Sequence, residues 1–409
     1  MKILHTADWH LGKMLDTFSR LDEQREVLAE ICEIAENHDV DAVIIAGDLF
    51  DGFSPSNQAS ELLYSTLHRL SAHGKRAVIA IAGNHDSPER IEVPDALARA
   101  CGIIFMGFPN TIITPFKTQQ GLEVLRSDAG FVELKLPKHA TPLRLLLTPY
   151  ANELRLKTYL GGNQSEDSLR VHLQQHWAKL ANQYCDNQGV NILATHLFMM
   201  KKGGEQPEEP DDEKSILHIG GASVVYSEQI PPQIQYVALG HLHRLQTIDK
   251  SPCPMVYSSS PLAYSFAEAD QTKYVVMLNA EADQAIDYKA IELKSGKKLL
   301  KNKFEAIDDA LAWLAQNQEA IVQLTLVTET YLEAKDKKRL MDTHPNLMPI
   351  IPEIKAKKGS DNLSNKTIQS LDGQSIEDLF VNYFQHKKGQ TPNSNLLAVL
   401  REVLATDTE

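Results

Sequence analysis

The chain has 409 residues, of which 43% are hydrophobic and 7% aromatic, and its formal net charge is −13 at pH 7. This length exceeds what one hydrophobic core usually supports and predicts two or three domains. The sequence has no apolar run long enough to cross a membrane, and its first residues do not resemble a signal peptide. The four cysteines form no CxxC pair, which disfavours a structural zinc site and favours a reduced, cytoplasmic setting.

Short apolar runs alternate with amphipathic segments in the first part of the chain, which predicts a layered α/β fold. We expect strands at residues 2–7, 41–47, 76–83, 143–148, 190–195, 234–240 and 273–278. Apolar residues recur at helical spacing between Leu21 and Ala35 and between Leu62 and Leu70, so a helix is expected in each interval. A long polar helix is expected near 166–187.

The composition changes after Leu293. Five lysines then occur within ten residues that contain no acid: Lys294, Lys297, Lys298, Lys301 and Lys303. A helix, a strand, a second helix and a second strand are expected at 306–317, 321–328, 335–343 and 348–355. The predicted organisation is therefore a main domain at 1–280, a small α+β domain at 285–355, a polar linker at 356–374 and a helical pair at 375–409.

Five polar motifs directly follow predicted strands. They are Asp8-Trp9-His10, Gly47-Asp48-Leu49-Phe50-Asp51, Gly83-Asn84-His85-Asp86, Thr195-His196 and Gly240-His241-Leu242-His243. Taken singly, each has an ordinary explanation, since such motifs are often surface turns and a lone histidine such as His196 is more often a core residue. Ligands of open α/β sheets bind beyond the carboxyl ends of the strands, so the five motifs together predict one shared site.

The side chains of these motifs indicate the chemistry. Carboxylate, imidazole and amide groups without a thiolate favour Mn²⁺ or Fe²⁺ over a structural zinc ion. Two metals that lie a few ångströms apart need a bridging carboxylate, for which Asp48 is the natural candidate. A histidine that is not a ligand can then protonate the leaving oxygen.

Four stretches carry a family resemblance: HTADWHLG (5–12), AGDLFD (46–51), AGNHDS (82–87) and ALGHLHR (238–244). They are similar to the motifs of calcineurin-like metallophosphoesterases and, within these, of the SbcD nuclease subunits. The resemblance implies a four-layer α/β sandwich, followed by a small α+β cap domain and a C-terminal helical pair. The chain would then be a two-metal phosphodiester hydrolase.

The resemblance also implies roles for individual residues. One metal would be held by Asp8, His10, Asp48 and His243, and the second by Asp48, Asn84, His196 and His241. His85 would be the catalytic histidine, and Asp51 would orient it through a hydrogen bond. The five lysines would contact DNA, with the alternative that they are simply solvated.

The activity that the resemblance implies is that of a DNA exonuclease and endonuclease acting on duplex ends and hairpins in repair and recombination. It implies two Mn²⁺ ions, with Fe²⁺ as a substitute and Mg²⁺ as a poor one. The implied partner is the SMC-like ATPase SbcC, in a heterotetramer that contains a homodimer of this chain, at the nucleoid in the cytoplasm. Two alternatives stay open, a small-substrate phosphatase or phosphodiesterase with the same metals, and a scaffold without catalysis.

The C-terminal segment has two apolar stripes at helical spacing. The side chains expected to bind the partner ATPase are Leu379, Phe380, Tyr383, Phe384, Leu397 and Leu400. The alternative is that this helical pair folds back onto the main body.

Overall fold

The computed structural model describes residues 1–157, 165–205, 207, 224–328 and 332–354, together with single positions 380, 381, 384, 392, 396, 397 and 400. Two compact units make up the chain, Met1–Glu353 and Ile354–Glu409. Among the described residues no helix is both long and apolar enough to cross a membrane.

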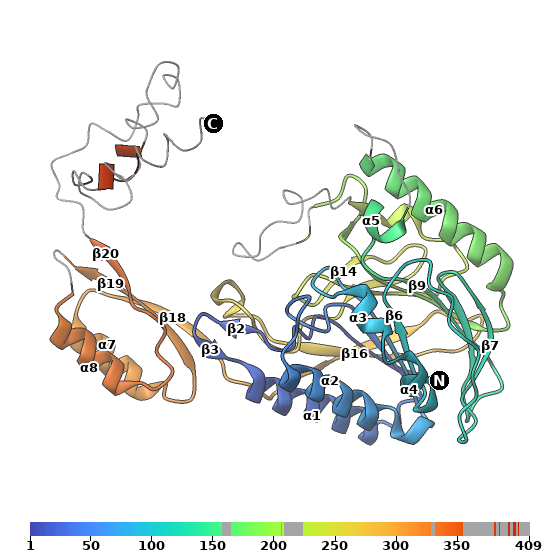
Figure 1. Ribbon diagram of the computed structural model, residues 1–409, viewed down its shortest axis with the longest axis horizontal. Coiled ribbons are helices and arrows are strands. Elements are labelled where there is room, and N and C mark those ends of the chain that lie inside the picture. Colours follow the sequence, from blue (N-terminus) through green and yellow to red (C-terminus); the bar gives the residue numbers. More distant parts are fainter. Residues whose placement is uncertain are drawn as a thin grey trace, which may run out of the picture. The chain divides into compact units, whose positions relative to one another are not determined.

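A six-stranded sheet forms one half of the core of the first unit (Figure 1). Its strand order is β17-β16-β1-β4-β5-β6, and β1, β4, β5 and β6 run parallel. The strands are β1 (Lys2–Thr6), β4 (Ala42–Ala46), β5 (Ala77–Ile81), β6 (Ile103–Met106), β16 (Tyr274–Asn279) and β17 (Asp287–Glu292). Every residue of β4 and β5 is buried, as expected of continuous apolar runs in a parallel sheet that is covered on both faces.

A seven-stranded sheet with the order β14-β15-β13-β10-β9-β8-β7 forms the other half. Its parallel centre consists of β9, β10, β13 and β15. The strands are β7 (Glu123–Asp128), β8 (Phe131–Lys135), β9 (Leu143–Thr148), β10 (Val190–His196), β13 (Tyr236–Gly240), β14 (Gln246–Asp249) and β15 (Met255–Tyr257). The seven strands that the sequence predicts in the main domain are divided between the two sheets and correspond to β1, β4, β5, β9, β10, β13 and β16. All seven are confirmed, to within two residues at each end.

Helices cover the outer face of each sheet. Those of the first unit, apart from the small domain, are α1 (Leu21–Asn37), α2 (Asn57–Leu70), α3 (Pro88–Glu92), α4 (Asp95–Ala100), α5 (Glu153–Leu156) and α6 (Ser165–Tyr184). The side chain of Ser56 caps α2 by accepting a hydrogen bond from the backbone of Ala59. Short 3₁₀ turns occur at Ala72–Gly74, Ser227–Gln229 and Phe266–Glu268.

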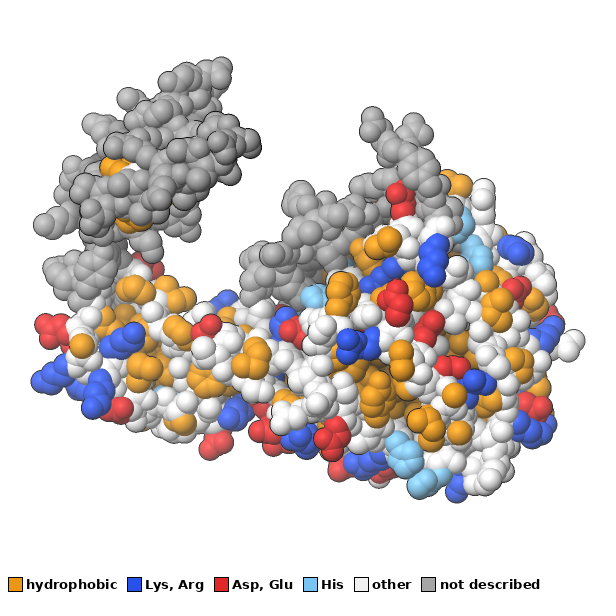
Figure 2. Space-filling view, viewed as in Figure 1, with side chains coloured by type: hydrophobic (Ala, Val, Ile, Leu, Met, Phe, Trp, Pro, Cys, Tyr) orange, Lys and Arg blue, Asp and Glu red, His pale blue; other side chains and the backbone are white. Residues whose placement is uncertain are grey.

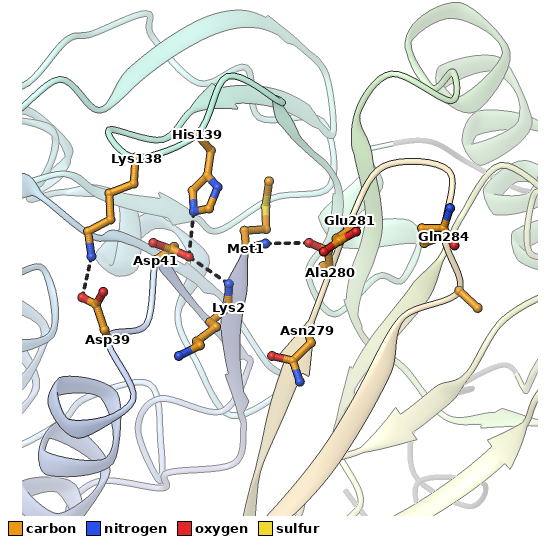
Figure 3. A pocket seen from close by; sticks show the side chains of 11 residues that line it. Met1, Lys2, Asp39, Asp41, Lys138, His139, Asn279, Ala280, Glu281 and Gln284 are labelled. Carbon is orange, nitrogen blue, oxygen red and sulfur yellow. Dashed lines mark hydrogen bonds and ion pairs between the residues drawn. The ribbon is translucent and has the colours of Figure 1, made fainter.

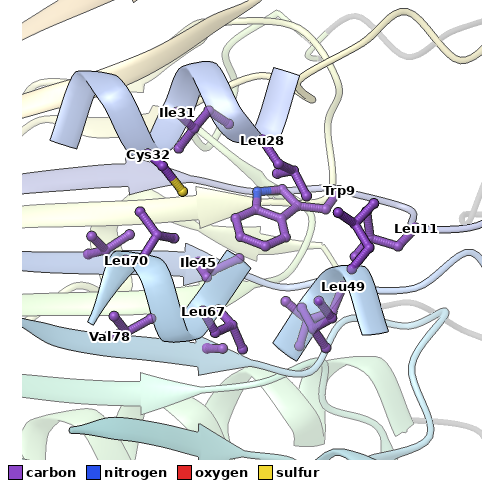
Figure 4. Close-up of a cluster of buried hydrophobic side chains, with 14 of the residues drawn as sticks. Trp9, Leu11, Leu28, Ile31, Cys32, Ile45, Leu49, Leu67, Leu70 and Val78 are labelled. Carbon is purple, nitrogen blue, oxygen red and sulfur yellow. The ribbon is translucent and has the colours of Figure 1, made fainter. Parts of the chain in front are cut away.

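Three apolar clusters separate the layers. The first lies between α1, α2 and the six-stranded sheet, where the buried indole of Trp9 contacts side chains of both helices (Figure 4). A second cluster lies between the two sheets, and a third packs α6, including Trp177, on the seven-stranded sheet. The order helix, sheet, sheet, helix is the four-layer sandwich that the resemblance implies.

A separate three-stranded sheet, β18-β19-β20, carries the helices α7 and α8. The elements are β18 (Leu299–Phe304), α7 (Ile307–Gln316), β19 (Ile321–Thr328), α8 (Ala334–Thr343) and β20 (Ile351–Ile354). The predicted small domain begins at 285, but β17 pairs with β16 in the main sheet, so the separate sheet begins only at Leu299. The remaining short strands are β2 (Met14–Leu15), β3 (Phe18–Ser19), β11 (Met199–Met200) and β12 (Val225–Tyr226).

Candidate metal centre

All seven predicted ligands lie where a parallel strand ends. Asp8 and His10 follow β1, Asp48 follows β4, Asn84 follows β5, His196 ends β10, and His241 and His243 follow β13. Strand β4 of one sheet contacts β10 and β13 of the other. The carboxyl ends of both sheets therefore meet, and the five motifs converge as the strand argument predicts.

The backbone around the ligands adopts an uncommon conformation. The φ angles of Asp8, His10, Asp48 and His241 are 55°, 44°, 47° and 112°, in the left-handed region. A residue other than glycine pays about 1–3 kcal/mol there, and such strain persists only where neighbouring groups enforce it. Here the backbone N–H of His10 donates to the carbonyl of Asp48 at 2.9 Å, and that of His241 donates to the carboxylate of Asp8 at 2.9 Å. The ligand loops therefore hold one another in place.

Two glycines allow these loops to approach closely. A Cβ at Gly83 would overlap the carboxylate and amide of Asp48, and a Cβ at Gly240 would overlap the carbonyl of Ala46. Neither glycine has a positive φ. Their role is thus to let two segments of the main chain touch.

The first group of predicted ligands surrounds one point. The Nε2 atoms of His10 and His243 lie 3.0 Å apart, and ligand atoms of Asp8, His10 and His243 all lie within 4.8 Å of one another. Asp48 Oδ2 is 3.5 Å from His10 Nε2. All four side chains of this group are buried.

The second group lies on the other side of Asp48. Asn84 Oδ1 is 2.9 Å from His196 Nε2 and 3.2 Å from His241 Nδ1. Asp48 Oδ2 is 3.3 Å from His196 Nε2. One carboxylate oxygen of Asp48 is therefore shared by the two groups, which is the arrangement that a bridging ligand requires.

The protonation of the imidazoles shows that these residues fit a cation. Burial alone would raise the pKa of Glu268, but His243 and Lys273 outweigh this effect and lower the pKa to about 2. This carboxylate therefore only accepts hydrogen bonds. The Nδ1 of His243 lies 3.2 Å from Glu268, and that of His196 lies 2.8 Å from the carbonyl of Ala46. Both rings thus carry the proton on Nδ1 and leave the Nε2 lone pair for a proton or a metal ion, beside Asp48 in the case of His196 and beside Nε2 of His10 in the case of His243.

The pKa values of the buried acids and of His196 also favour a bound cation. Burial raises the pKa of Asp8 to about 7. Burial also raises the pKa of Asp48, but His196 outweighs it and holds that pKa well below its usual range. Burial lowers the pKa of His196, but the carboxylate of Asp48 outweighs it and raises the value to about 9. A positive charge is therefore favoured beside Asp48, and a divalent cation would supply it by displacing a proton.

Two buried residues to which the sequence assigns no role, Asp86 and Arg155, support the Gly83–Asp86 loop. The carboxylate of Asp86 accepts hydrogen bonds from the backbone N–H groups of Gly83, Leu49 and Phe50, at 2.8, 3.0 and 2.9 Å. It thus joins the loops that carry Asn84 and Asp48. The guanidinium of Arg155 donates to the carbonyls of Gly83 and Asp86 at 2.7 and 2.8 Å from the opposite side.

Glu268 and Lys273 were missed as well. Glu268 pairs with the Lys273 ammonium, which also donates to the carbonyl of His243 at 2.9 Å. Both side chains are buried, so this pair fixes the ring of His243 and the backbone behind it. The sequence shows an acid and a lysine five residues apart, but nothing in it indicates that they are buried or which histidine they approach.

His85 lies beside the centre, but its contact with Asp51 differs from the expectation. The ring Nδ1 of His85 lies 3.1 Å from the backbone carbonyl of Asp51, not from its carboxylate. That carboxylate forms an ion pair with Lys13 at 2.9 Å. The hydrogen bond that the resemblance implies is thus made by the main chain, while the carboxylate of Asp51 lies beside Lys13 and His10.

The five lysines occupy the start of the small domain. The backbone N–H of Lys294 donates to Glu30 at 2.9 Å, and that of Lys297 donates to Glu23 at 2.7 Å. The ammonium of Lys303 pairs with Glu353 at 2.7 Å. Lys298 and Lys301 are exposed. The segment is thus anchored to α1 through its backbone, which leaves most of its charge at the surface.

Only part of the predicted partner-binding segment can be compared. Phe380, Phe384, Leu397 and Leu400 are helical, and the rings of Phe380 and Phe384 lie 5.9 Å apart, as neighbours four residues apart on a helix should. Leu379 and Tyr383 lie outside the described residues, as does the predicted linker at 356–374.

Two cavities occur at the opposite ends of the strands. One of about 520 Å³ lies beside the start of β1, where the terminal ammonium of Met1 donates to the carbonyl of Ala280 and Lys138 pairs with Asp39 (Figure 3). The other, of about 560 Å³, is lined by residues such as Asn191 and Gln235. Neither of these two cavities is lined by a predicted ligand.

Comparisons with known proteins agree with this geometry. The profile of the calcineurin-like phosphoesterase family matches residues 1–245. The SbcD subunit of the SbcCD nuclease from Bacillus subtilis is 33% identical over 412 residues, which cover 98% of this chain and 97% of that protein. The corresponding SbcD subunits of Rhodobacter capsulatus and Staphylococcus epidermidis are 32% and 27% identical, over 68% and 99% of this chain and 66% and 99% of their own lengths.

Two solved structures are more distant. A Thermus thermophilus protein and a dimetal phosphatase from Danio rerio share 10% and 11% sequence identity with this chain, with TM-scores of 0.36 and 0.39. Each match covers 72% of this chain and 99% of the other. The family profile spans the five motifs from Asp8 to His243, and the relatives span the rest. The chain therefore belongs to the calcineurin-like phosphoesterase family and, within it, to the SbcD nuclease subunits.

Proposed function

We propose that this chain is the nuclease subunit of an SbcCD-type complex and cleaves DNA phosphodiester bonds with two Mn²⁺ ions. Its substrates would be duplex ends, as an exonuclease, and hairpins, as an endonuclease, in DNA repair and recombination. The observation that carries the proposal is the sharing of Asp48 Oδ2 between two groups of ligand atoms, at 3.5 and 3.3 Å. The similarity to an SbcD nuclease subunit over 98% of the chain supports the choice of DNA as the substrate.

The proposed ligand sets are those expected from the sequence. Asp8, His10, Asp48 and His243 would hold one ion, and Asp48, Asn84, His196 and His241 the other. Imidazole-rich sites of this kind suit Mn²⁺ and accept Fe²⁺, whereas Mg²⁺ prefers oxygen ligands and retains its waters. When bound, the two ions would activate a water molecule and neutralise charge on the phosphate.

His85 would supply the proton to the leaving oxygen. The carbonyl of Asp51, 3.1 Å from Nδ1, can only accept a hydrogen bond and therefore keeps a proton on that nitrogen. The other nitrogen of the ring, Nε2, is then the one that gives up a proton when the ring is charged. The backbone N–H of His85 donates to Asp48 Oδ1 at 2.9 Å, which sets the ring beside the proposed bridging ligand.

The small domain is relevant to whether the substrate is DNA or a small phosphoester. We propose that it lays the DNA backbone across the metal centre, using Lys294, Lys297, Lys298, Lys301 and Lys303. The second candidate function is a phosphodiesterase or phosphatase for small substrates, which the net charge of −13 favours because it repels polyanions. DNA binding predicts a salt-dependent affinity, with a slope of about 0.9 per phosphate contact in a plot of log affinity against log salt.

The C-terminal segment would bind the SMC-like ATPase SbcC. Two short helices bury too little surface to be stable alone, and a groove on another chain would supply the missing contact. The complex would act at the nucleoid, in the cytoplasm. The relatives of this chain are named as subunits of SbcCD. The match to the Bacillus subtilis protein leaves only 2% of this chain uncovered and therefore includes the C-terminal segment.

We also propose that the chain forms a homodimer within the heterotetramer. Hydrophobic side chains gather on the surface over α3 and α4 (Figure 2). Val93 and Leu97 in this region are 81% and 78% exposed, although both are large and apolar. Analytical ultracentrifugation of the wild type and of Val93→Asp/Leu97→Asp measures the state directly, and we expect the substitutions to shift dimer to monomer.

One assay tests the activity. Purified protein with Mn²⁺ is given linear duplex DNA, hairpin DNA and a chromogenic bis-phosphodiester, and each rate is compared with that in Mg²⁺. A DNA nuclease should cut both DNA substrates and hydrolyse the small ester slowly. Rapid hydrolysis of the ester without any DNA cleavage, also with the ATPase present, would favour the small-substrate enzyme.

A further inference from the structure

The imidazole of His10 has one nitrogen whose partner is not yet accounted for. Its Nε2 lies 3.0 Å from Nε2 of His243, in the first ligand group. Its Nδ1 is buried and has no hydrogen-bond partner among the described residues. The carboxylate nearest to that nitrogen among them is Asp51, whose Oδ1 lies 3.6 Å away.

Two of the other proposed ligand histidines, His243 and His196, show what such a nitrogen requires. His243 Nδ1 lies 3.2 Å from Glu268, and His196 Nδ1 lies 2.8 Å from the carbonyl of Ala46. In both, an acceptor on Nδ1 holds the proton there and keeps the Nε2 lone pair available to a metal. His10 Nε2 is likewise proposed to bind a metal through its lone pair, so the Nδ1 of His10 also needs an acceptor.

Asp51 is built into the structure beside His10. Its backbone N–H donates to the carbonyl of Leu11 at 3.2 Å, and the backbone N–H of Leu11 donates to Leu49 at 3.0 Å. The oxygen that faces His10, Oδ1, also lies 2.9 Å from the ammonium of Lys13. The main chain thus fixes the distance between Asp51 and His10, and a small rotation of either side chain closes the gap from 3.6 Å to a hydrogen bond.

We propose that the carboxylate of Asp51 is the positioning group of His10, and that His85 depends only on the backbone carbonyl of Asp51. This inference rests on the proposed metal centre. It assigns the side chain to the first metal site and the main chain to the proton donor. Removal of the carboxylate should therefore weaken one metal site and leave the orientation of His85 intact.

The ion pair with Lys13 suggests an alternative role for Asp51, which can be tested. If Asp51 served only to neutralise the ammonium of Lys13, then the lone charge left by Asp51→Ala would repel the cation. Removing both charges would then restore binding. If Asp51 orients His10, the double variant Lys13→Met/Asp51→Ala should bind metal as weakly as Asp51→Ala.

The experiment measures Mn²⁺ binding to the full-length chain by calorimetry. We expect Asp51→Ala to weaken one of the two equivalents about 10-fold to 100-fold, as loss of such partners usually does, and to leave the other unchanged. Asp51→Asn, which keeps an acceptor but no charge, should fall between. Lys13→Met should bind at least as tightly as the wild type, and Asp22→Ala, which removes an exposed acid on α1, serves as the matched control.

A second measurement follows the histidine itself. In the Co²⁺-substituted protein, the exchangeable Nδ1 proton of His10 should give a shifted proton resonance that moves or disappears in Asp51→Ala but not in Asp22→Ala. Unchanged Mn²⁺ affinity in Asp51→Ala, or recovery in the double variant, would overturn the proposal. A wild-type chain that binds no second equivalent would instead reject the proposed metal centre, and this inference with it.

Discussion

Asp48 occupies a position that no neighbouring side chain can take over. Its Oδ2 lies within 3.5 Å of ligand atoms in both groups, and the side chain is buried. We expect Asp48→Ala to lose both Mn²⁺ equivalents and all activity. Elemental analysis after desalting measures the metal content, with Asp39→Ala, an exposed acid before the same strand, as the control. Two retained equivalents would contradict the bridging role.

His85 separates proton transfer from metal binding. Its backbone bond to Asp48 does not depend on the side chain, so His85→Gln should keep both ions. The rate should fall about 10²-fold to 10⁴-fold, the usual contribution of general acid catalysis. Measuring kcat and Mn²⁺ content on the same preparation checks both statements. A parallel loss of metal would place the ring among the ligands instead.

The sequence predicted which side chains converge at the strand ends but not their neighbours. Asp8, Asp48 and His241 could be found because strand ends and residue types suffice to locate a convergent donor set. Glu268 and Asp86 could not, since a buried acid is recognisable only from the atoms that surround it. The contact of Asp51 differs from the expectation, because residue spacing does not distinguish a carbonyl from a carboxylate of the same residue.

At the scale of elements, most strands that were predicted are continuous apolar runs, whereas β8, which was not predicted, carries an inward charge. Strand β8 includes Glu133, which is buried because Arg144 and Arg126 pair with it at 2.7 and 2.5 Å. Partners on adjacent strands thus make an acid acceptable in a core position. The acid interrupts the apolar run of β8, whereas the runs of β4 and β10 were evident.

This ion pair network should make stability depend on pH. Burial raises the pKa of Glu133, but the hydrogen bonds from Arg126 and Arg144 outweigh it and hold the pKa below its usual value. A depressed pKa contributes stability above the unfolded-state value of about 4.3, and that stability is lost as the pH falls through the folded-state pKa.

Glu133→Gln should therefore lower the free energy of unfolding by about 3 kcal/mol at neutral pH, as breaking a buried pair does. The difference from the wild type should shrink below about pH 4, where the acid becomes protonated in the unfolded chain. Urea unfolding followed by tryptophan fluorescence at several pH values measures it. Glu123→Gln on β7, which removes a more exposed partner of Lys117, should have little effect at any pH.

At the scale of the molecule, the small domain is tied to the metal centre by packing. Leu299, Ile321 and Met348 form one apolar cluster with Phe266 and with Leu15 of the β2–β3 hairpin. Phe266 begins the 3₁₀ turn that ends at Glu268, the partner of His243, and the hairpin follows His10. The sequence indicated a separate domain from its composition, but this joint depends on contacts between distant segments and could not be foreseen.

The C-terminal segment should be needed for the complex and not for the chemistry. The first 353 residues form a compact unit that contains every proposed ligand. We expect deletion of residues 375–409 to abolish ATP-stimulated DNA cleavage and co-purification with the SMC-like ATPase. Hydrolysis of a small phosphodiester should persist, because the helices would contribute only the apolar contact to the partner.

A less disruptive variant controls for the possibility that the truncated chain misfolds. Phe380→Ala/Phe384→Ala removes two rings from one helical face, where they lie 5.9 Å apart, and leaves the length unchanged. Affinity for the ATPase should fall by at least 10-fold, since large aromatic side chains dominate such contacts. Lys387→Ala/Lys388→Ala, in the same segment, is the matched control. If the truncated or substituted protein loses the small-ester activity as well, the helices belong to the core of this chain, and the proposed contact with the ATPase is wrong.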